Sequence, residues 1–71
     1  MPLIIFEGPK MEREEKRELV RSFAEAASRV TGIRMEVFTT VIHENEPENV
    51  GTGGELLVDK WARESGGPGR Q

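Results

Sequence analysis

The sequence contains no cysteine and only one histidine, and these two shortages exclude the usual reinforcements of a small domain. Without cysteine there are no disulfides, and one histidine without cysteine partners does not build a structural zinc site. A chain of 71 residues also buries a smaller share of its surface than a longer chain does. Association of subunits is the stabilising device that remains, so we expect one small domain that works as an oligomer. We expect neither a metal nor a cofactor.

Long apolar segments and clustered positive charge are missing as well. The apolar run that ends at Phe6 has no basic stretch before it and is far too short for a signal sequence or a membrane span. The net charge is -3, and the lysines and arginines are interleaved with acidic residues. Binding of nucleic acid depends on clustered basic side chains that neutralise phosphates. We therefore expect a cytoplasmic protein that binds neither a membrane nor nucleic acid.

The first half of the chain has the pattern of a strand followed by an amphipathic helix. Residues 3–6 form a continuous apolar run with two β-branched side chains, which is typical of a strand buried on both faces. Gly8 and Pro9 end this strand. Over residues 10–30 the apolar side chains recur at helical spacing, and Gly32 is a suitable stop. The opposite face of this helix is a run of charges, which we interpret as solvent exposed.

The second half combines another strand with glycine-rich turns. Residues 35–44 alternate so that both faces are largely apolar, which predicts a strand parallel to the first with a right-handed crossover. Residues 51–54 suit a hairpin, and residues 56–63 fit either a short helix or a segment laid on a neighbouring subunit. We therefore expect an α+β fold over residues 1–64, a single β-α-β unit plus a C-terminal hairpin, and a disordered tail at residues 65–71.

Pro2 has the most distinctive chemistry in the chain. Met1 is normally removed when the next residue is as small as proline, and its removal turns the ring nitrogen of Pro2 into a free secondary amine. Apolar neighbours at the start of a strand disfavour the protonated amine and lower its pKa. Such an amine is a general base near neutral pH. The alternative interpretation is that a proline follows the first methionine by chance.

Three features occur in one order: the sequence Pro-Leu-Ile-Ile-Phe-Glu-Gly from Pro2, the amphipathic helix, and Val-Gly-Thr-Gly-Gly-Glu at residues 50–55. Together they resemble the 4-oxalocrotonate tautomerase family, from Pro2 to about Val58. The resemblance implies a β-α-β subunit that dimerises and builds a homohexamer as a trimer of dimers. It also implies an isomerase in which Pro2 moves a proton in the keto–enol conversion of a small 2-oxo acid. Cationic and hydrogen-bonding groups would hold the carboxylate and stabilise the enolate.

The resemblance also points to three positions that bind substrate. The family has an arginine just past the Glu-Gly that ends the first strand, and Lys10 is the nearest cation here. We consider Lys10 a candidate carboxylate anchor beside a helix start, with a solvated lysine as the alternative. A second family arginine falls at Thr39, which donates a hydrogen bond but carries no charge. Val50 replaces the family's aromatic residue before the glycine-rich turn. We expect His43 to be structural or solvated, with an acid or base as the alternative. We expect Trp61 to pack at a subunit interface, with stacking on a substrate as the alternative.

Two other functions remain open. A non-catalytic oligomeric module of the same fold is favoured by the absence of a cation at Thr39. A hydratase or dehalogenase of the same family would use protonated Pro2 and a carboxylate that activates water, but no spacing favours Glu7, Glu44 or Glu48 for that role. A pH profile separates the base from the acid.

Overall fold

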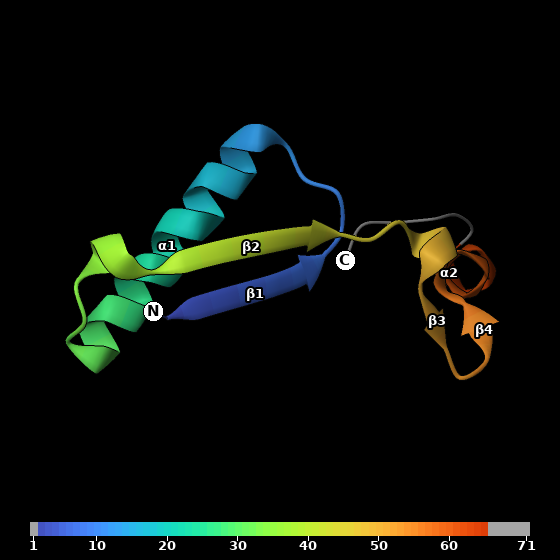
Figure 1. The fold of residues 1–71 in the computed structure, drawn as a ribbon. Helices are drawn as coiled ribbons and strands as arrows, with labels where there is room; N and C mark the ends of the chain where they lie inside the picture. Colours follow the sequence, from blue (N-terminus) through green and yellow to red (C-terminus); the bar gives the residue numbers. More distant parts are fainter. Residues whose placement is uncertain (1, 66–71) are drawn as a thin grey trace. The chain divides into compact units, whose positions relative to one another are not determined.

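A computed structural model describes residues 2–65 of the chain. Its elements are β1 (Leu3–Gly8), α1 (Arg13–Thr31), the 3₁₀ turn η1 (Met35–Val37), β2 (Thr39–Glu44), the 3₁₀ turn η2 (Pro47–Asn49), β3 (Gly51–Thr52), β4 (Glu55–Leu56) and α2 (Leu57–Ser65) (Figure 1). The described residues form two compact units. The first holds residues 2–7 and 11–43, and the second holds residues 8–10 and 44–65.

The strands β1 and β2 are hydrogen-bonded neighbours that run in the same direction. The N–H of Thr39 donates to the carbonyl of Pro2 at 3.1 Å, and the N–H of Asn45 donates to the carbonyl of Gly8 at 2.8 Å. Each donor lies 37 positions after its acceptor (39 against 2, and 45 against 8), and a constant offset is the mark of a parallel pair. With α1 as the connection between them, these strands confirm the predicted β-α-β unit.

The helix α1 begins three residues later than predicted. Glu12 is the N-cap, and it forms a reciprocal capping box with Glu15, whose carboxylate accepts from the N–H of Glu12 at 3.0 Å. The capping box satisfies backbone donors that the first turn leaves unpaired, and it places two carboxylates at the positive end of the helix dipole. The predicted stop is confirmed, because Gly32 has a φ of 78° and donates its N–H to the carbonyl of Ser28 at 2.8 Å.

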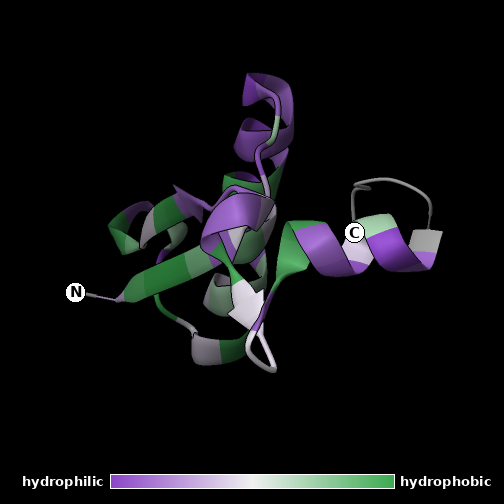
Figure 2. Ribbon diagram, turned by 90° about the vertical axis from the view of Figure 1, so that its right-hand side faces the viewer, coloured by the Kyte–Doolittle hydropathy of each residue, from purple (hydrophilic) through white to green (hydrophobic). Residues whose placement is uncertain are grey.

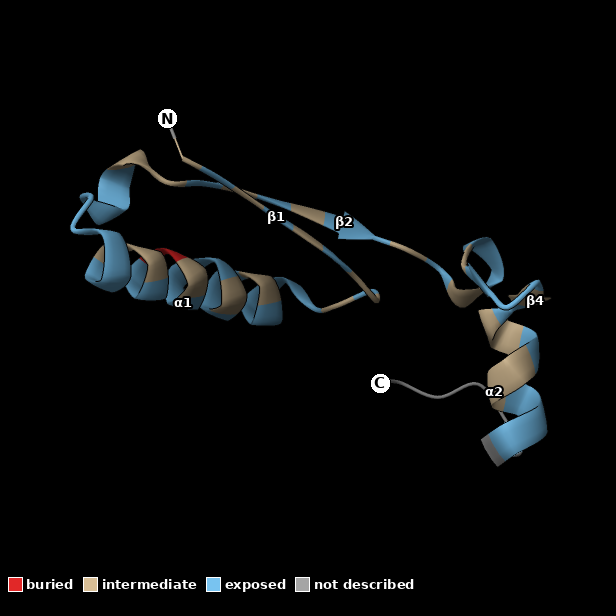
Figure 3. Ribbon diagram, turned by 90° about the horizontal axis from the view of Figure 1, so that it is seen from below, coloured by how far each residue is buried: buried red, intermediate tan, exposed pale blue. Residues whose placement is uncertain are grey.

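One face of the parallel sheet packs against α1, and the other face is open in this subunit. Along β1 the exposure alternates, with Ile4 and Phe6 half-buried and Leu3 and Ile5 each 56% exposed. The rings of Phe6 and Phe23 pack with their centroids 5.8 Å apart and tilted by 47°. Figure 3 shows α1 along one side of the two strands. The strand predicted to be buried on both faces is therefore covered on one face by its own chain.

The hydrophobic core of a single subunit is very small. Across residues 2–64, Ala24 on α1 is the one buried residue, at 8% exposed. Figure 3 shows the buried part of α1 on the side toward the strands. Figure 2 shows the hydrophobic start of β1 and the hydrophilic first turns of α1. The apolar face of α1 therefore packs toward the strands, but a single subunit buries little apolar surface.

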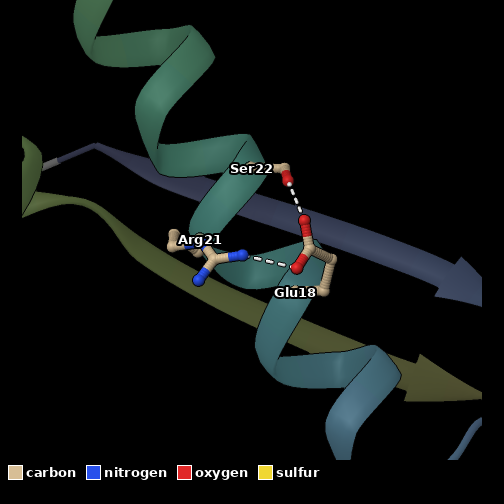
Figure 4. Close-up of polar contacts among 3 residues, drawn as sticks. All are labelled: Glu18, Arg21 and Ser22. Carbon is tan, nitrogen blue, oxygen red and sulfur yellow. Dashed lines mark hydrogen bonds and ion pairs between the residues drawn. The ribbon is translucent and has the colours of Figure 1, made fainter.

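The charged surface of α1 is exposed and paired within the helix. Arg17 bonds the carboxylate of Glu14, and Arg21 bonds that of Glu18, each at a spacing of three residues. Ser22 also donates to Glu18 at 3.5 Å (Figure 4). Exposed pairs of this kind stabilise a helix by about 0.2–0.5 kcal/mol each. The structure confirms the interpretation of this run as a solvent-facing surface.

The second strand is shorter than the predicted residues 35–44. Residues 35–37 form η1, in which successive backbone N–H groups donate to carbonyls three residues earlier at 3.2 Å. From Thr39 onward the predicted alternation is confirmed. Thr40 and Ile42 are half-buried, whereas Thr39 and Val41 are exposed. The turn η1 thus replaces the first part of the predicted strand, and β2 begins at Thr39.

The second unit contains the predicted glycine-rich hairpin. The strands β3 and β4 pair antiparallel, with Gly51 opposite Leu56 and Thr52 opposite Glu55. The two residues of the loop, 53 and 54, have φ of 62° and 83°. Type I′ hairpin turns require positive φ at both central positions, and glycine reaches them without steric cost. The Gly-Gly pair is therefore explained by the turn.

The helix α2 follows the hairpin directly, which decides between the two alternatives for this segment. It packs against η2, and Trp61 is half-buried. Arg63 bonds the carboxylate of Glu55, and this hydrogen bond raises the pKa of the Arg63 guanidinium. Within residues 2–65 neither α-helix has both the length and the hydropathy of a membrane-crossing segment. Of the tail predicted at residues 65–71, Ser65 ends α2 and the remainder lies outside the described residues.

Candidate active site

Pro2 stands immediately before β1 and is half-buried. Its carbonyl accepts the N–H of Thr39, the first residue of β2, at 3.1 Å. The sheet therefore holds Pro2 by its carbonyl, while its ring nitrogen contributes no donor to the ladder in a peptide-bonded chain. Two of the four residues singled out in the sequence, Pro2 and Thr39, are thus brought side by side. The side chain of Thr39 is exposed at this point.

Lys10 lies in the second unit and is exposed. The helix start that was predicted beside Lys10 carries carboxylates of its own. The helix begins at Arg13, and its first turn is already occupied by the carboxylates of Glu12 and Glu15. Those negative charges disfavour a second anion at the same backbone donors. A carboxylate bound by Lys10 would depend on the ammonium group and not on the helix dipole.

Pro2 and Lys10 flank opposite ends of β1 along the chain and belong to different compact units. A six-residue strand extends about 20 Å at roughly 3.3 Å per residue.

Val50 lies in the second unit, where its backbone is bonded on both sides. Its N–H donates to the carbonyl of Pro47 at 3.3 Å, and its carbonyl accepts the N–H of Leu57 at 2.7 Å. These bonds tie the residue before β3 to η2 and to the start of α2. The half-buried Val50 is therefore a fixed apolar position at the base of the hairpin.

His43 and Glu7 form a cross-strand pair on the parallel sheet. The Nδ1 atom of His43 lies 3.5 Å from a carboxylate oxygen of Glu7, and both side chains are more than half exposed. This contact gives His43 a partner on the neighbouring strand. It also occupies Glu7, one of the carboxylates considered for activating water.

Arg34 was not identified from the sequence, although the structure places it at the same end of the sheet as Pro2. It precedes η1, in the connection between α1 and β2, and Figure 1 shows this connection beside the start of β1. In any β-α-β unit the segment entering the second strand arrives near the start of the first. Applied to the sequence, this rule could have placed Arg34 near Pro2. Ile33 and Met35, on either side, are 41% and 40% exposed.

A half-buried proline at the head of a parallel β-α-β unit, followed by a Gly-Gly hairpin, defines a class of small α+β subunit. The model of the tautomerase enzyme family matches residues 2–60 of the chain. The chain belongs to the tautomerase family, which confirms the resemblance seen in the sequence.

Three solved structures illustrate the similarity. DmpI from Archaeoglobus fulgidus is 39% identical, with 79% of this chain and 97% of that chain covered and a TM-score of 0.73. A 4-oxalocrotonate tautomerase homologue is 32% identical, with 83% and 95% covered and a TM-score of 0.73. YwhB, a homologue of 4-oxalocrotonate tautomerase, is 27% identical, with 82% and 97% covered and a TM-score of 0.76. No match was found among the curated proteins.

Proposed function

We propose that this protein is a tautomerase that catalyses keto–enol proton transfer on a small 2-oxo acid, with Pro2 as the general base once Met1 is removed. The observation that supports this best is the placement of Pro2 in a chain of the tautomerase family. It is half-buried at the head of β1, and its carbonyl is bonded to the backbone of Thr39.

The chemistry is a balanced proton transfer. The lone pair of the Pro2 nitrogen takes a proton from the carbon next to the carbonyl, and the C–H bonding pair becomes the new C=C bond. The carbonyl π pair moves to oxygen, giving an enolate that is then protonated. The Pro2 ammonium returns its proton to oxygen or, in the reverse direction, to carbon. Apolar surroundings favour the neutral base, and exclusion of water strengthens hydrogen bonds to the enolate.

The oligomer belongs to the same proposal. In this proposal Lys10 comes to Pro2 from another subunit, because the two residues flank opposite ends of a strand that is about 20 Å long. On the outer face of the sheet Leu3 and Ile5 are 56% exposed and Val41 is exposed, so an apolar surface is left for a second copy. Fully burying one such side chain stabilises by about 1.5–3 kcal/mol. A homohexamer built as a trimer of dimers would cover this surface and complete each site with Lys10, Thr39 and Val50.

Two measurements test the function together. Intact-mass analysis of natively produced protein shows whether Pro2 is the first residue, as the base requires. Ultraviolet absorbance then follows the conversion of the enol forms of phenylpyruvate and 2-hydroxymuconate. We expect turnover by the wild type and at least a tenfold loss in Pro2→Ala, in line with the factor of about 100 to 10,000 that a positioned base contributes. Unchanged turnover in Pro2→Ala would remove the mechanism.

A non-catalytic oligomeric module is the second candidate, and one observation favours it. The residue beside Pro2 at the head of β2 is the uncharged Thr39, where the family pattern has an arginine. A site without a cation there stabilises an enolate less. Protein with a free Pro2 amine that turns over none of the enolisable acids would support the module.

A further inference from the structure

A 2-oxo acid carries a negative carboxylate next to its reacting carbonyl, and Thr39, the residue that the sheet places beside Pro2, supplies no positive charge. Lys10 belongs to the other compact unit of the chain. A cation from the same unit as Pro2 would therefore come from another segment of that unit. This inference rests on the proposed function, because it concerns the acid that Pro2 would act on.

Arg34 is placed to supply this charge from the same chain as Pro2. One 3₁₀ turn separates it from Thr39, whose N–H lies 3.1 Å from the Pro2 carbonyl. At a rise of roughly 2.0 Å per residue, the five residues from Arg34 to Thr39 span on the order of 10 Å. Figures 1 and 3 both show the α1–β2 connection at the end of the sheet where β1 starts. A long arginine side chain can bridge this gap to an acid bound at Pro2.

The backbone of Arg34 is fixed while its side chain remains accessible. Its carbonyl accepts the N–H of Val37 at 3.2 Å, which anchors the residue to η1. Arg34 is exposed, and among residues 2–65 its guanidinium has no ion pair, not even with nearby Glu36. The arginines at positions 17, 21 and 63 each bond a glutamate, whereas Arg13 and Arg29, like Arg34, have no ion pair within the described part of the chain.

The immediate neighbours of Arg34 suit a binding site for an organic acid. Ile33 and Met35 are apolar and remain 41% and 40% exposed, so they offer apolar surface on either side of the charge. A guanidinium presents a planar fork of donors that matches both oxygens of a carboxylate. Reduced contact with water strengthens such a charge-assisted hydrogen bond.

We infer that Arg34 binds the substrate carboxylate at Pro2 of its own subunit and takes the part of the cation that is missing at Thr39. Lys10 of a neighbouring subunit is then left for a second anionic or carbonyl oxygen of a longer acid. Arg34 recognises the carboxylate, whereas proton transfer remains with Pro2.

Benzoylformate tests this inference, because it is a 2-oxo acid without an enolisable hydrogen and its binding is independent of turnover. Its Kd is measured by calorimetry for the wild type, Arg34→Gln, Arg34→Lys and Arg29→Gln. Arg29 is an exposed arginine in the last turn of α1 and serves as the matched control. We expect Arg34→Gln to raise Kd at least tenfold, Arg34→Lys to recover part of the loss, and Arg29→Gln to stay within twofold of the wild type.

Kinetics give a second readout that a structural role would not produce. With phenylpyruvate, Arg34→Gln is expected to raise KM at least tenfold while kcat changes less than threefold. For phenylacetaldehyde, which enolises but lacks the carboxylate, the same variant should match the wild type. A Kd and KM within twofold of the wild type, or a wild type that does not bind benzoylformate, would overturn the inference.

The outcomes for Arg34 and for Pro2 are distinguishable. If Pro2→Ala keeps full turnover while Arg34→Gln loses binding, the proposed mechanism fails and the carboxylate site stands. If Pro2→Ala loses turnover but binds benzoylformate normally, and Arg34→Gln also binds it normally, the mechanism stands and the assignment of Arg34 fails.

Discussion

The carbonyl of Pro2 accepts the N–H of Thr39 at 3.1 Å, and this one bond joins the first described residue to a strand that begins 37 positions later. Terminal residues are poorly ordered unless hydrogen bonds or packing fix them. Here Pro2 is fixed by a backbone hydrogen bond of the parallel sheet. The position of Pro2 is therefore decided by β2 as well as by its own strand.

Removing the hydrogen bond between Thr39 and Pro2 should make the position of Pro2 less fixed. Thr39→Pro deletes the N–H, and proline is tolerated at the first residue of a strand. We expect a loss of about 0.5–1.5 kcal/mol in the free energy of unfolding, the usual net value of one hydrogen bond. Turnover should fall several-fold. Differential scanning calorimetry and the phenylpyruvate assay measure the two effects.

Thr39→Ser is the matched control for the backbone, because it keeps both the N–H and the hydroxyl and removes a single methyl group. It should retain the stability that Thr39→Pro loses. If both variants are equally destabilised, the bond to Pro2 does not anchor the strand.

The pH profile should have an acid limb. A neutral amine is the active form of a general base, so protonation of Pro2 removes activity as pH falls. We expect kcat/KM to drop about tenfold per pH unit below the pKa of the amine and to level off above it. Stopped-flow absorbance over the range of protein stability gives the profile. Activity that instead disappears as pH rises would point to protonated Pro2 and to hydratase chemistry.

Mixed oligomers should show that Pro2 and Lys10 act across subunits. Pro2→Ala and Lys10→Gln are each expected to lose most activity alone. After unfolding and refolding together in equal amounts, about a quarter of the sites combine a native Pro2 with a native Lys10 from another chain. Activity should therefore return toward that fraction. Mixing without refolding is the control, and no recovery would show that the two residues act in one chain. Full activity of Lys10→Gln by itself would show that Lys10 is an ordinary solvated lysine.

The pair of Phe6 and Phe23 should carry much of the stability of the first unit. Phenylalanine-to-alanine changes in cores cost about 3–5 kcal/mol, and Phe6 is half-buried, so we expect Phe6→Ala to cost about 2–3 kcal/mol. Urea unfolding measures the loss. Ile5→Ala, on the outer face of the same strand, is the comparison. It should affect the concentration dependence of unfolding more than the stability of the isolated subunit.

Local patterns were sufficient to predict which elements the chain forms. The apolar run at residues 3–6, the helical spacing before Gly32 and the Gly-Gly turn were each interpreted correctly, because they reflect backbone preferences and side-chain period. The start of α1 was not. The helix was predicted from residue 10, whereas the reciprocal capping of Glu12 and Glu15 starts it at Arg13.

The sequence alone determined the β-α-β order, the hairpin and the family, since each depends on residues that are close together in the chain. Only the tertiary structure decided that Pro2 bonds Thr39 and that Arg34 comes to the end of the sheet where Pro2 lies. Such neighbours depend on strand register and on the path of the crossover. The strand register and the path of the crossover are determined by packing between segments that are distant in the sequence, so local residue preferences do not predict them.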